Sequence, residues 1–149
     1  MPRIHSTSQQ GTYNELLVEV ECLARGWLVF RPSRPDGEID LIVINQRKQI
    51  QGLQIRAAHW EKENGRGGRD RLRISLRHGG KNERYSELVT IFVAVKDKRF
   101  WIFPSRDFRG SRIKFSERSN KYEDAWHHIG EAVSNLYKAE DSPQLSIVL

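Results

Sequence analysis

The stretch GEIDLIVINQRKQIQGLQIRAA, residues 37–58, predicts two neighbouring strands. Residues 39–44 are apolar except for Asp40, which is typical of a strand buried on both faces. The last ten residues of the stretch alternate, so that Gln54 and Arg56 share one face of the second strand. A three-residue turn between the strands would place Asp40 directly opposite Gln54. The stretch therefore predicts that a carboxylate, an amide and a guanidinium lie close together.

Further strands and two helices are predicted around this pair. A helix is predicted at Asn120–Tyr137, because Asn120 and Glu123 have the spacing of a capping box and the apolar residues after them follow at helical spacing. A helix at Thr12–Arg25 would bury one apolar stripe, formed by Leu16, Leu17, Val20, Leu23 and Ala24. The predicted strands are Trp27–Arg31, Ile39–Ile44, Gln49–Ala58, Leu72–Leu76, Thr90–Val95, Phe100–Pro104 and Arg112–Phe115. The fold class is α/β, with a mixed, mostly antiparallel sheet flanked by the two helices.

Composition and length describe one basic domain. The 149 residues include 25 Lys and Arg against 19 Asp and Glu, a net charge of +6 that suits a protein that meets a polyanion. Residues 64–84 hold six Arg and one Lys against two acids, on glycine-rich segments. The only cysteine, Cys22, excludes an internal disulfide and predicts a reduced compartment, the cytoplasm. We expect a flexible arm at residues 1–10, one domain at residues 11–137 and a tail at residues 138–149.

No run of 18 apolar residues is present, so the sequence predicts no membrane partner. A same-sign cluster on glycine-rich loops favours contacts to phosphate groups. The candidate DNA-binding residues in the basic segment are Arg66, Arg69, Arg71, Arg73, Arg77 and Lys81. Solubilising charge is the alternative interpretation of this segment.

A candidate metal site is formed by oxygen-bearing side chains on the predicted helix and strands. Asp40 and Gln54 offer hard oxygen ligands for Mg²⁺, and Glu15 on the helix could add a carboxylate. Mg²⁺ would neutralise charge on a phosphate and activate water, while Arg56 holds the phosphate. The alternative is structural: Asp40 would pair with Arg56, Gln54 would hydrogen-bond across the sheet, and Glu15 would be solvated. His59, just past the predicted strand Gln49–Ala58, is either a water-positioning group or an exposed polar residue.

The order of several short motifs resembles the PD-(D/E)XK nuclease superfamily. These motifs are Gly11 with Glu15, Gly26-Trp27, GEIDLIV at 37–43 and LQIRAA at 53–58. More narrowly, the chain resembles the group I intron homing endonucleases of that superfamily, which are similar in core to archaeal Holliday-junction resolvases. The motifs that extend this resemblance are Arg84-Tyr85, IFVAV at 91–95, RFWIFP at 99–104 and NKYEDAW at 120–126. The resemblance implies a restriction-endonuclease-like core.

The resemblance also implies catalytic residues. They fall on Glu15, Asp40, Gln54 and Arg56, and the first three would bind Mg²⁺. Arg56 departs from the pattern, which has lysine there, and a guanidinium does not readily transfer a proton. The function implied is site-specific, Mg²⁺-dependent cleavage of double-stranded DNA. The alternatives are a DNA-binding module that has lost catalysis and a Holliday-junction resolvase. Because one such site cuts one strand, a homodimer or homotetramer is expected.

Overall fold

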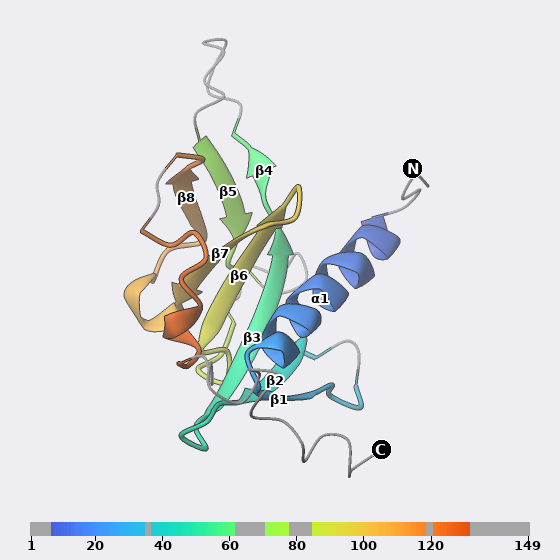
Figure 1. Cartoon of the computed structure of the whole chain (residues 1–149). Coiled ribbons are helices and arrows are strands. Elements are labelled where there is room, and N and C mark those ends of the chain that lie inside the picture. Colours follow the sequence, from blue (N-terminus) through green and yellow to red (C-terminus); the bar gives the residue numbers. More distant parts are fainter. Residues whose placement is uncertain (1–6, 35–36, 62–70, 78–84, 119–120, 132–149) are drawn as a thin grey trace.

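The fold is seen in a computed structural model of the chain, which describes residues 7–34, 37–61, 71–77, 85–118 and 121–131. The predicted tail, and the candidates Arg66, Arg69 and Lys81, lie outside these residues. One α-helix, eight strands and two short 3₁₀ helices are described (Figure 1). They are α1 (Thr7–Ala24), β1 (Leu28–Phe30), β2 (Leu41–Ile44), β3 (Ile50–Ala57), β4 (His59–Trp60), β5 (Arg71–Ser75), β6 (Ile91–Lys96), β7 (Arg99–Pro104), η1 (Ser105–Asp107), β8 (Arg112–Ser116) and η2 (Trp126–His128).

The main sheet has five strands in the order β1-β2-β3-β6-β7. Only the central pair β3–β6 is parallel, so the predicted mixed, mostly antiparallel sheet is confirmed. The predicted register of β2 on β3 is also confirmed, because Leu41 pairs with Leu53 and Ile44 with Ile50. Asn45 fixes the turn between them, since its Oδ1 accepts the N–H groups of Arg47 and Gln49 at 3.0 Å each.

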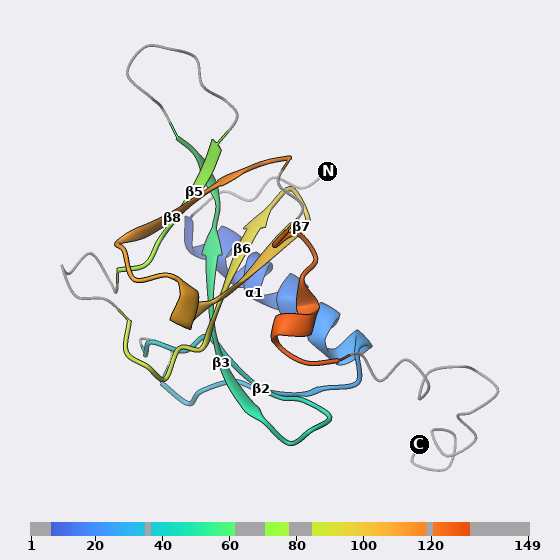
Figure 2. The same ribbon diagram turned by 90° about the vertical axis from the view of Figure 1, so that its left-hand side faces the viewer.

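A second, three-stranded sheet has the order β4-β5-β8 and is antiparallel throughout. β4 follows β3 directly, so one long stretch of chain passes from the main sheet into the small one (Figure 1). α1 packs on one face of the main sheet and the small sheet lies on the other side, as the second view shows (Figure 2). Each interface holds a hydrophobic core, with Leu53 and Ile55 in the first and Phe92 and Leu72 in the second.

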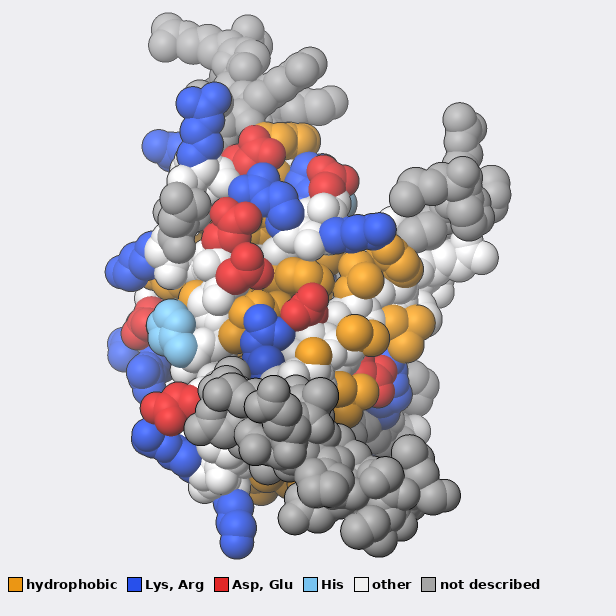
Figure 3. Space-filling view, viewed as in Figure 1, with side chains coloured by type: hydrophobic (Ala, Val, Ile, Leu, Met, Phe, Trp, Pro, Cys, Tyr) orange, Lys and Arg blue, Asp and Glu red, His pale blue; other side chains and the backbone are white. Residues whose placement is uncertain are grey.

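The buried side of α1 differs from the predicted one. Four of the five members of the predicted stripe are exposed, namely Leu16 at 48%, Val20 at 61%, Leu23 at 49%, and Ala24. The helix instead buries Val18 and Cys22, together with Asn14. Apolar residues occur on more than one side of this helix, so spacing alone does not select the side that meets the sheet. Hydrophobic side chains consequently gather on the surface over α1 (Figure 3).

The start of α1 also differs from the prediction. The helix begins at Thr7, so residues 7–10 are helical rather than part of an N-terminal arm. The first turns are supported by a hydrogen bond from Gln10 Nε2 to Asn14 Oδ1 of 2.9 Å. No helix in the described residues is long and apolar enough to span a membrane.

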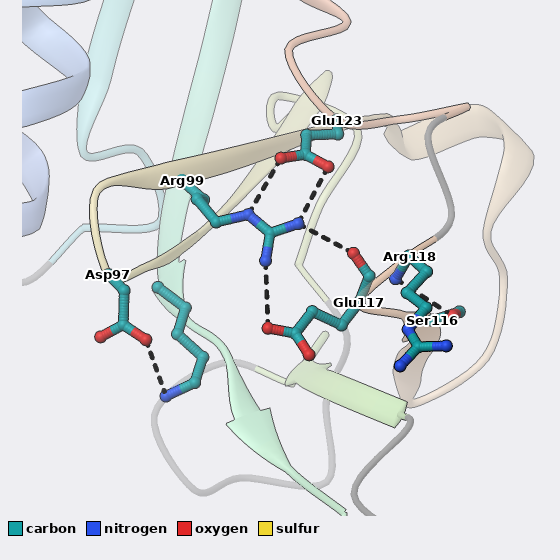
Figure 4. A network of polar contacts seen from close by, with 7 residues as sticks. Asp97, Arg99, Ser116, Glu117, Arg118 and Glu123 are labelled. Atoms are coloured by element: carbon teal, nitrogen blue, oxygen red, sulfur yellow. Dashed lines mark hydrogen bonds and ion pairs between the residues drawn. The ribbon is translucent and has the colours of Figure 1, made fainter.

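The predicted helix at Asn120–Tyr137 is wrong for its described part, residues 121–131, which hold only the 3₁₀ turn η2. Glu123 does not cap a helix, because its two carboxylate oxygens accept from Arg99 Nε at 2.9 Å and Nη2 at 3.0 Å (Figure 4). The backbone at Glu123 forms a bridge with Trp101 of β7, and Asp124 has a φ of +52°. Pairing with β7 therefore overrides the local helical signal.

Candidate functional site

Asp40 lies immediately before β2 and is held against β3 by two hydrogen bonds. Its backbone N–H donates to the Leu53 carbonyl at 2.8 Å, and its Oδ2 accepts from the Ile55 N–H at 2.8 Å. Burial, with a smaller contribution from nearby Glu15, raises the pKa of the Asp40 carboxyl from its ordinary value to about 6. The Ile55 N–H and the Arg56 charge act in the opposite direction. The folded protein therefore disfavours the ionised form of the Asp40 carboxyl.

Glu15 and Arg56 reach Asp40 from different elements. Glu15 comes from α1 and Arg56 from β3, and both act on the charge of Asp40. Arg31, the residue that follows β1, also contacts Glu15, because Arg31 Nη1 donates a hydrogen bond to Glu15 Oε2 at 3.4 Å. The structure thus brings together three of the four predicted catalytic residues.

The fourth residue, Gln54, is buried in β3, with 6% of its surface exposed. Strand alternation sends Leu53 and Ile55 into the core under α1, so Gln54 shares the other face with Arg56. Among the described residues Gln54 Oε1 has no hydrogen-bond partner, whereas the Asp40 carboxylate bonds to the neighbouring Ile55 N–H. A buried oxygen without a partner costs about 1–3 kcal/mol, so this amide is suited to an additional ligand.

The oxygen donors of the predicted metal site are the Asp40 and Glu15 carboxylates and the buried Gln54 amide. The described residues contain no group of three or more His, Cys, Asp or Glu side chains that could hold a metal ion. A cage built only from protein carboxylates is thus not seen in this part of the chain. Mg²⁺ commonly uses one or two carboxylates and fills its remaining positions with water and substrate phosphate oxygens. The chemistry of the donors therefore fits Mg²⁺ better than it fits a metal that prefers nitrogen or sulfur.

A cavity of about 800 Å³ opens beside this cluster, between the first turns of α1 and the small sheet. Its lining includes Arg56 of β3 and backbone or side-chain atoms of Ile55, and it contains no acidic residue. Its other basic residues are His59, Arg73, Arg77 and Arg112. Burial and the charges of Arg73, Lys96 and Arg56 lower the pKa of His59, which favours its neutral form. The cavity is suited to an anion, because four guanidinium groups lie around it.

The basic residues predicted to bind DNA are partly within the described residues. Arg71 and Arg73 of β5 are exposed, and Arg77 lies just past that strand. Sequence reasoning missed Arg112 and Lys114 of β8 as members of the same surface. The signal was present, because RIKFS at 112–116 repeats the alternation of RLRIS at 71–75.

Tyr85 is a further residue of the site that sequence reasoning gave no role. Its ring is buried and packs on Phe92, with 5.7 Å between the ring centroids. Burial raises the pKa of the Tyr85 hydroxyl, and Arg56 and Asp40 lie close enough to act on it in opposite directions. No local pattern marks this tyrosine, because its position depends on how the loop before β6 folds over β3.

Comparison with known proteins gives a structural likeness. No protein-family profile and no curated protein sequence matches the chain. The solved structure of a bacterial homing endonuclease, I-Ssp6803I, is similar, with a TM-score of 0.64 and 21% sequence identity. The likeness covers 85% of this chain and 93% of that one. This chain therefore has the α/β fold that is seen in that homing endonuclease.

Proposed function

We propose that the chain is a DNA endonuclease of the PD-(D/E)XK type, which hydrolyses phosphodiester bonds with Mg²⁺. The observation that carries this proposal is the buried Asp40 carboxylate, which lies close to Glu15 and to Arg56, a residue that also lines an arginine-rich cavity. A buried carboxyl with a raised pKa, close to an arginine that lines a basic cavity, is the arrangement expected of a site that holds a cation between protein and phosphate. The fold shared with a homing endonuclease supports the same activity and suggests site-specific cleavage of both DNA strands.

Asp40 and Glu15 would hold Mg²⁺ with their carboxylates, and the buried Gln54 amide oxygen on β3 would be a further ligand. When bound, Mg²⁺ would neutralise charge on the phosphate and make water more acidic. Arg56 would bind the scissile phosphate and stabilise the additional negative charge that forms during attack. Because a guanidinium remains protonated, Arg56 does not accept a proton, and the proton released by water leaves to solvent or to the DNA phosphate.

The proposal is tested by nicking of supercoiled plasmid in Mg²⁺ and in EDTA. We expect nicking with Mg²⁺ and none with EDTA. Retardation of the plasmid without nicking in Mg²⁺ would instead favour the second candidate, a DNA-binding module on a nuclease scaffold. That candidate is favoured by one observation, the arginine at position 56 where the related nucleases have lysine. Preferential cleavage of synthetic four-way junctions over linear duplexes would distinguish a Holliday-junction resolvase from both of these candidates.

The exposed arginines of β5 predict a salt-dependent contribution to DNA binding. Replacing Arg71 and Arg73 by alanine should reduce the slope of log affinity against log salt concentration by about one to two units, because each lost phosphate contact contributes about 0.9. Titrations of a duplex at several salt concentrations measure this slope. The matched control replaces Lys98 and Arg106, which lie elsewhere on the surface. An unchanged slope in the Arg71/Arg73 variant would show that these side chains do not contact phosphate.

A second copy of this chain, as a homodimer or homotetramer, is the partner that we propose for cleavage of both strands. The exposed stripe of α1, formed by Leu16, Val20 and Leu23, is the surface that suits it. The stripe is nearly neutral in charge, because the neighbouring Glu19 and Glu21 are paired with arginines of their own chain. A second copy would therefore meet apolar side chains and few unpaired charges.

Replacing Val20 by glutamate should weaken self-association at least about 100-fold, because an unpaired carboxylate would be buried in the interface. Sedimentation over a range of protein concentrations measures this change. Leu88→Glu is the control, since Leu88 is 67% exposed and lies on the loop before β6. Equal self-association of Val20→Glu and wild type would exclude this stripe as the interface.

A further inference from the structure

The solvent face of the small sheet carries a row of basic residues. Cross-strand pairing places His59, Arg73 and Lys114 side by side on one face of β4, β5 and β8. The same face carries Arg71 opposite Ser116 and Arg112 opposite Ser75. The opposite face packs into the core through Leu72, Ile74, Ile113 and Phe115. One side of this sheet is therefore apolar and buried, whereas the other is basic and exposed.

The charges on this face are not balanced within the described residues. Arg73 and Lys114 are directly opposite each other, an arrangement of like charges that destabilises an antiparallel pair. Glu61 is the one acid among the described residues of the face, and it pairs with Lys114 at 3.0 Å. Arg71, Arg73 and Arg112 have no ion pair with a described residue. A polyanion would remove the repulsion that the fold leaves in place.

The shape of this face fits the major groove of duplex DNA. Neighbouring strands lie about 4.8 Å apart, so the β5–β8 pair with its side chains is a narrow ribbon. The major groove is about 12 Å wide and admits a two-stranded ribbon, whereas the minor groove is about half as wide. Arginine can donate two hydrogen bonds to the O6 and N7 atoms of guanine at the edge of that groove.

The basic face is continuous with the candidate catalytic cavity. His59, Arg73 and Arg112 belong to the face and also line the cavity that contains Arg56. Arg71 and Lys114 lie farther along the same strands and do not line that cavity. A duplex seated on the face would therefore extend from the cavity towards Arg71 and Lys114.

We propose that the solvent face of the β4–β5–β8 sheet enters the major groove and reads guanine with arginine side chains. Arg71 is the base-reading residue farthest from the cavity, and Lys114 contacts the neighbouring phosphate or base edge. This inference rests on the proposed function in one respect, that duplex DNA is the ligand. It adds the groove that is recognised and the residues that recognise it.

The test uses duplexes selected by the wild-type protein from a random 30-bp library. The selected duplexes are made again with 7-deazaguanine, which lacks only the N7 acceptor in the major groove. We expect the wild-type protein to bind the modified duplexes at least about tenfold more weakly, because each bidentate contact to guanine loses the hydrogen bond to N7. Arg71→Ala/Lys114→Ala should bind the unmodified duplexes more weakly and should lose most of this discrimination. Lys98→Ala/Arg106→Ala, with the same loss of charge elsewhere, should keep it.

Three results would overturn the inference. They are selection that enriches no sequence, equal wild-type binding to guanine and 7-deazaguanine duplexes, and full discrimination by Arg71→Ala/Lys114→Ala. Failure of the proposed function has a different signature. Guanine discrimination without Mg²⁺-dependent nicking would support groove reading and reject the endonuclease, whereas nicking without discrimination would do the reverse.

Discussion

Asp40→Asn is expected to reduce Mg²⁺-dependent nicking at least about 1,000-fold while changing DNA affinity by less than about threefold. Asparagine keeps the size of the side chain and an oxygen that can accept from the Ile55 N–H. It removes the negative charge that would attract Mg²⁺, and a bound metal ion supplies several kcal/mol of charge stabilisation to phosphodiester cleavage. The arginines around the cavity are unchanged, so binding to DNA phosphates is retained.

Nicking rates and duplex titrations on the same preparation measure the two effects. Asp97→Asn is the matched control, because it makes the same substitution at an 82% exposed carboxylate in the β6–β7 turn. The control should nick and bind like the wild-type protein. Full nicking by Asp40→Asn would remove Asp40 from the proposed metal site, whereas an equal loss of nicking and affinity would indicate a role in binding alone.

The same substitution is expected to stabilise the folded protein at neutral pH. Burial raises the pKa of Asp40 from 3.8 to about 6, so the folded state binds the proton more tightly than the unfolded state does. Stability therefore falls as the pH rises from about 4 to about 6, and the loss persists above that range. Asp40→Asn removes this penalty, which corresponds to about 2–3 kcal/mol in the free energy of unfolding at pH 7.5.

Urea unfolding at pH 4 and at pH 7.5 measures this prediction. The stability difference between Asp40→Asn and wild type should be small at pH 4 and reach its full size at pH 7.5. Asp97→Asn should change the free energy of unfolding by less than about 0.5 kcal/mol at either pH, as is usual for an exposed site. A variant that is less stable than wild type at pH 7.5 would show that the Asp40 charge supports the fold. A gain in stability with a loss of activity is typical of a catalytic carboxylate.

Local patterns in the sequence were sufficient to predict the β2–β3 pair and the β6–β7 hairpin. The first depends on strand alternation and on the turn that begins at Asn45, and the second on the turn at Asp97 and Lys98, where φ is +50° and +61°. Both depend on interactions between residues close in sequence. The same patterns placed Asp40 and Arg56 near each other and singled out Glu15 of the helix as a further carboxylate, and the resemblance to PD-(D/E)XK nucleases implied its catalytic role. The role of Gln54 as a ligand stays a prediction.

The sequence by itself determined an α/β fold, the register that brings Asp40 to β3 and a concentration of positive charge near β5. Only the tertiary structure decided that Val18 and Cys22 of α1 are buried, that Glu123 pairs with Arg99, and that β4, β5 and β8 form a second sheet with a basic face. The physical reason is the range of the interactions. Periodicity and turns act over a few residues, whereas these choices depend on packing and hydrogen bonds between segments that are distant along the chain.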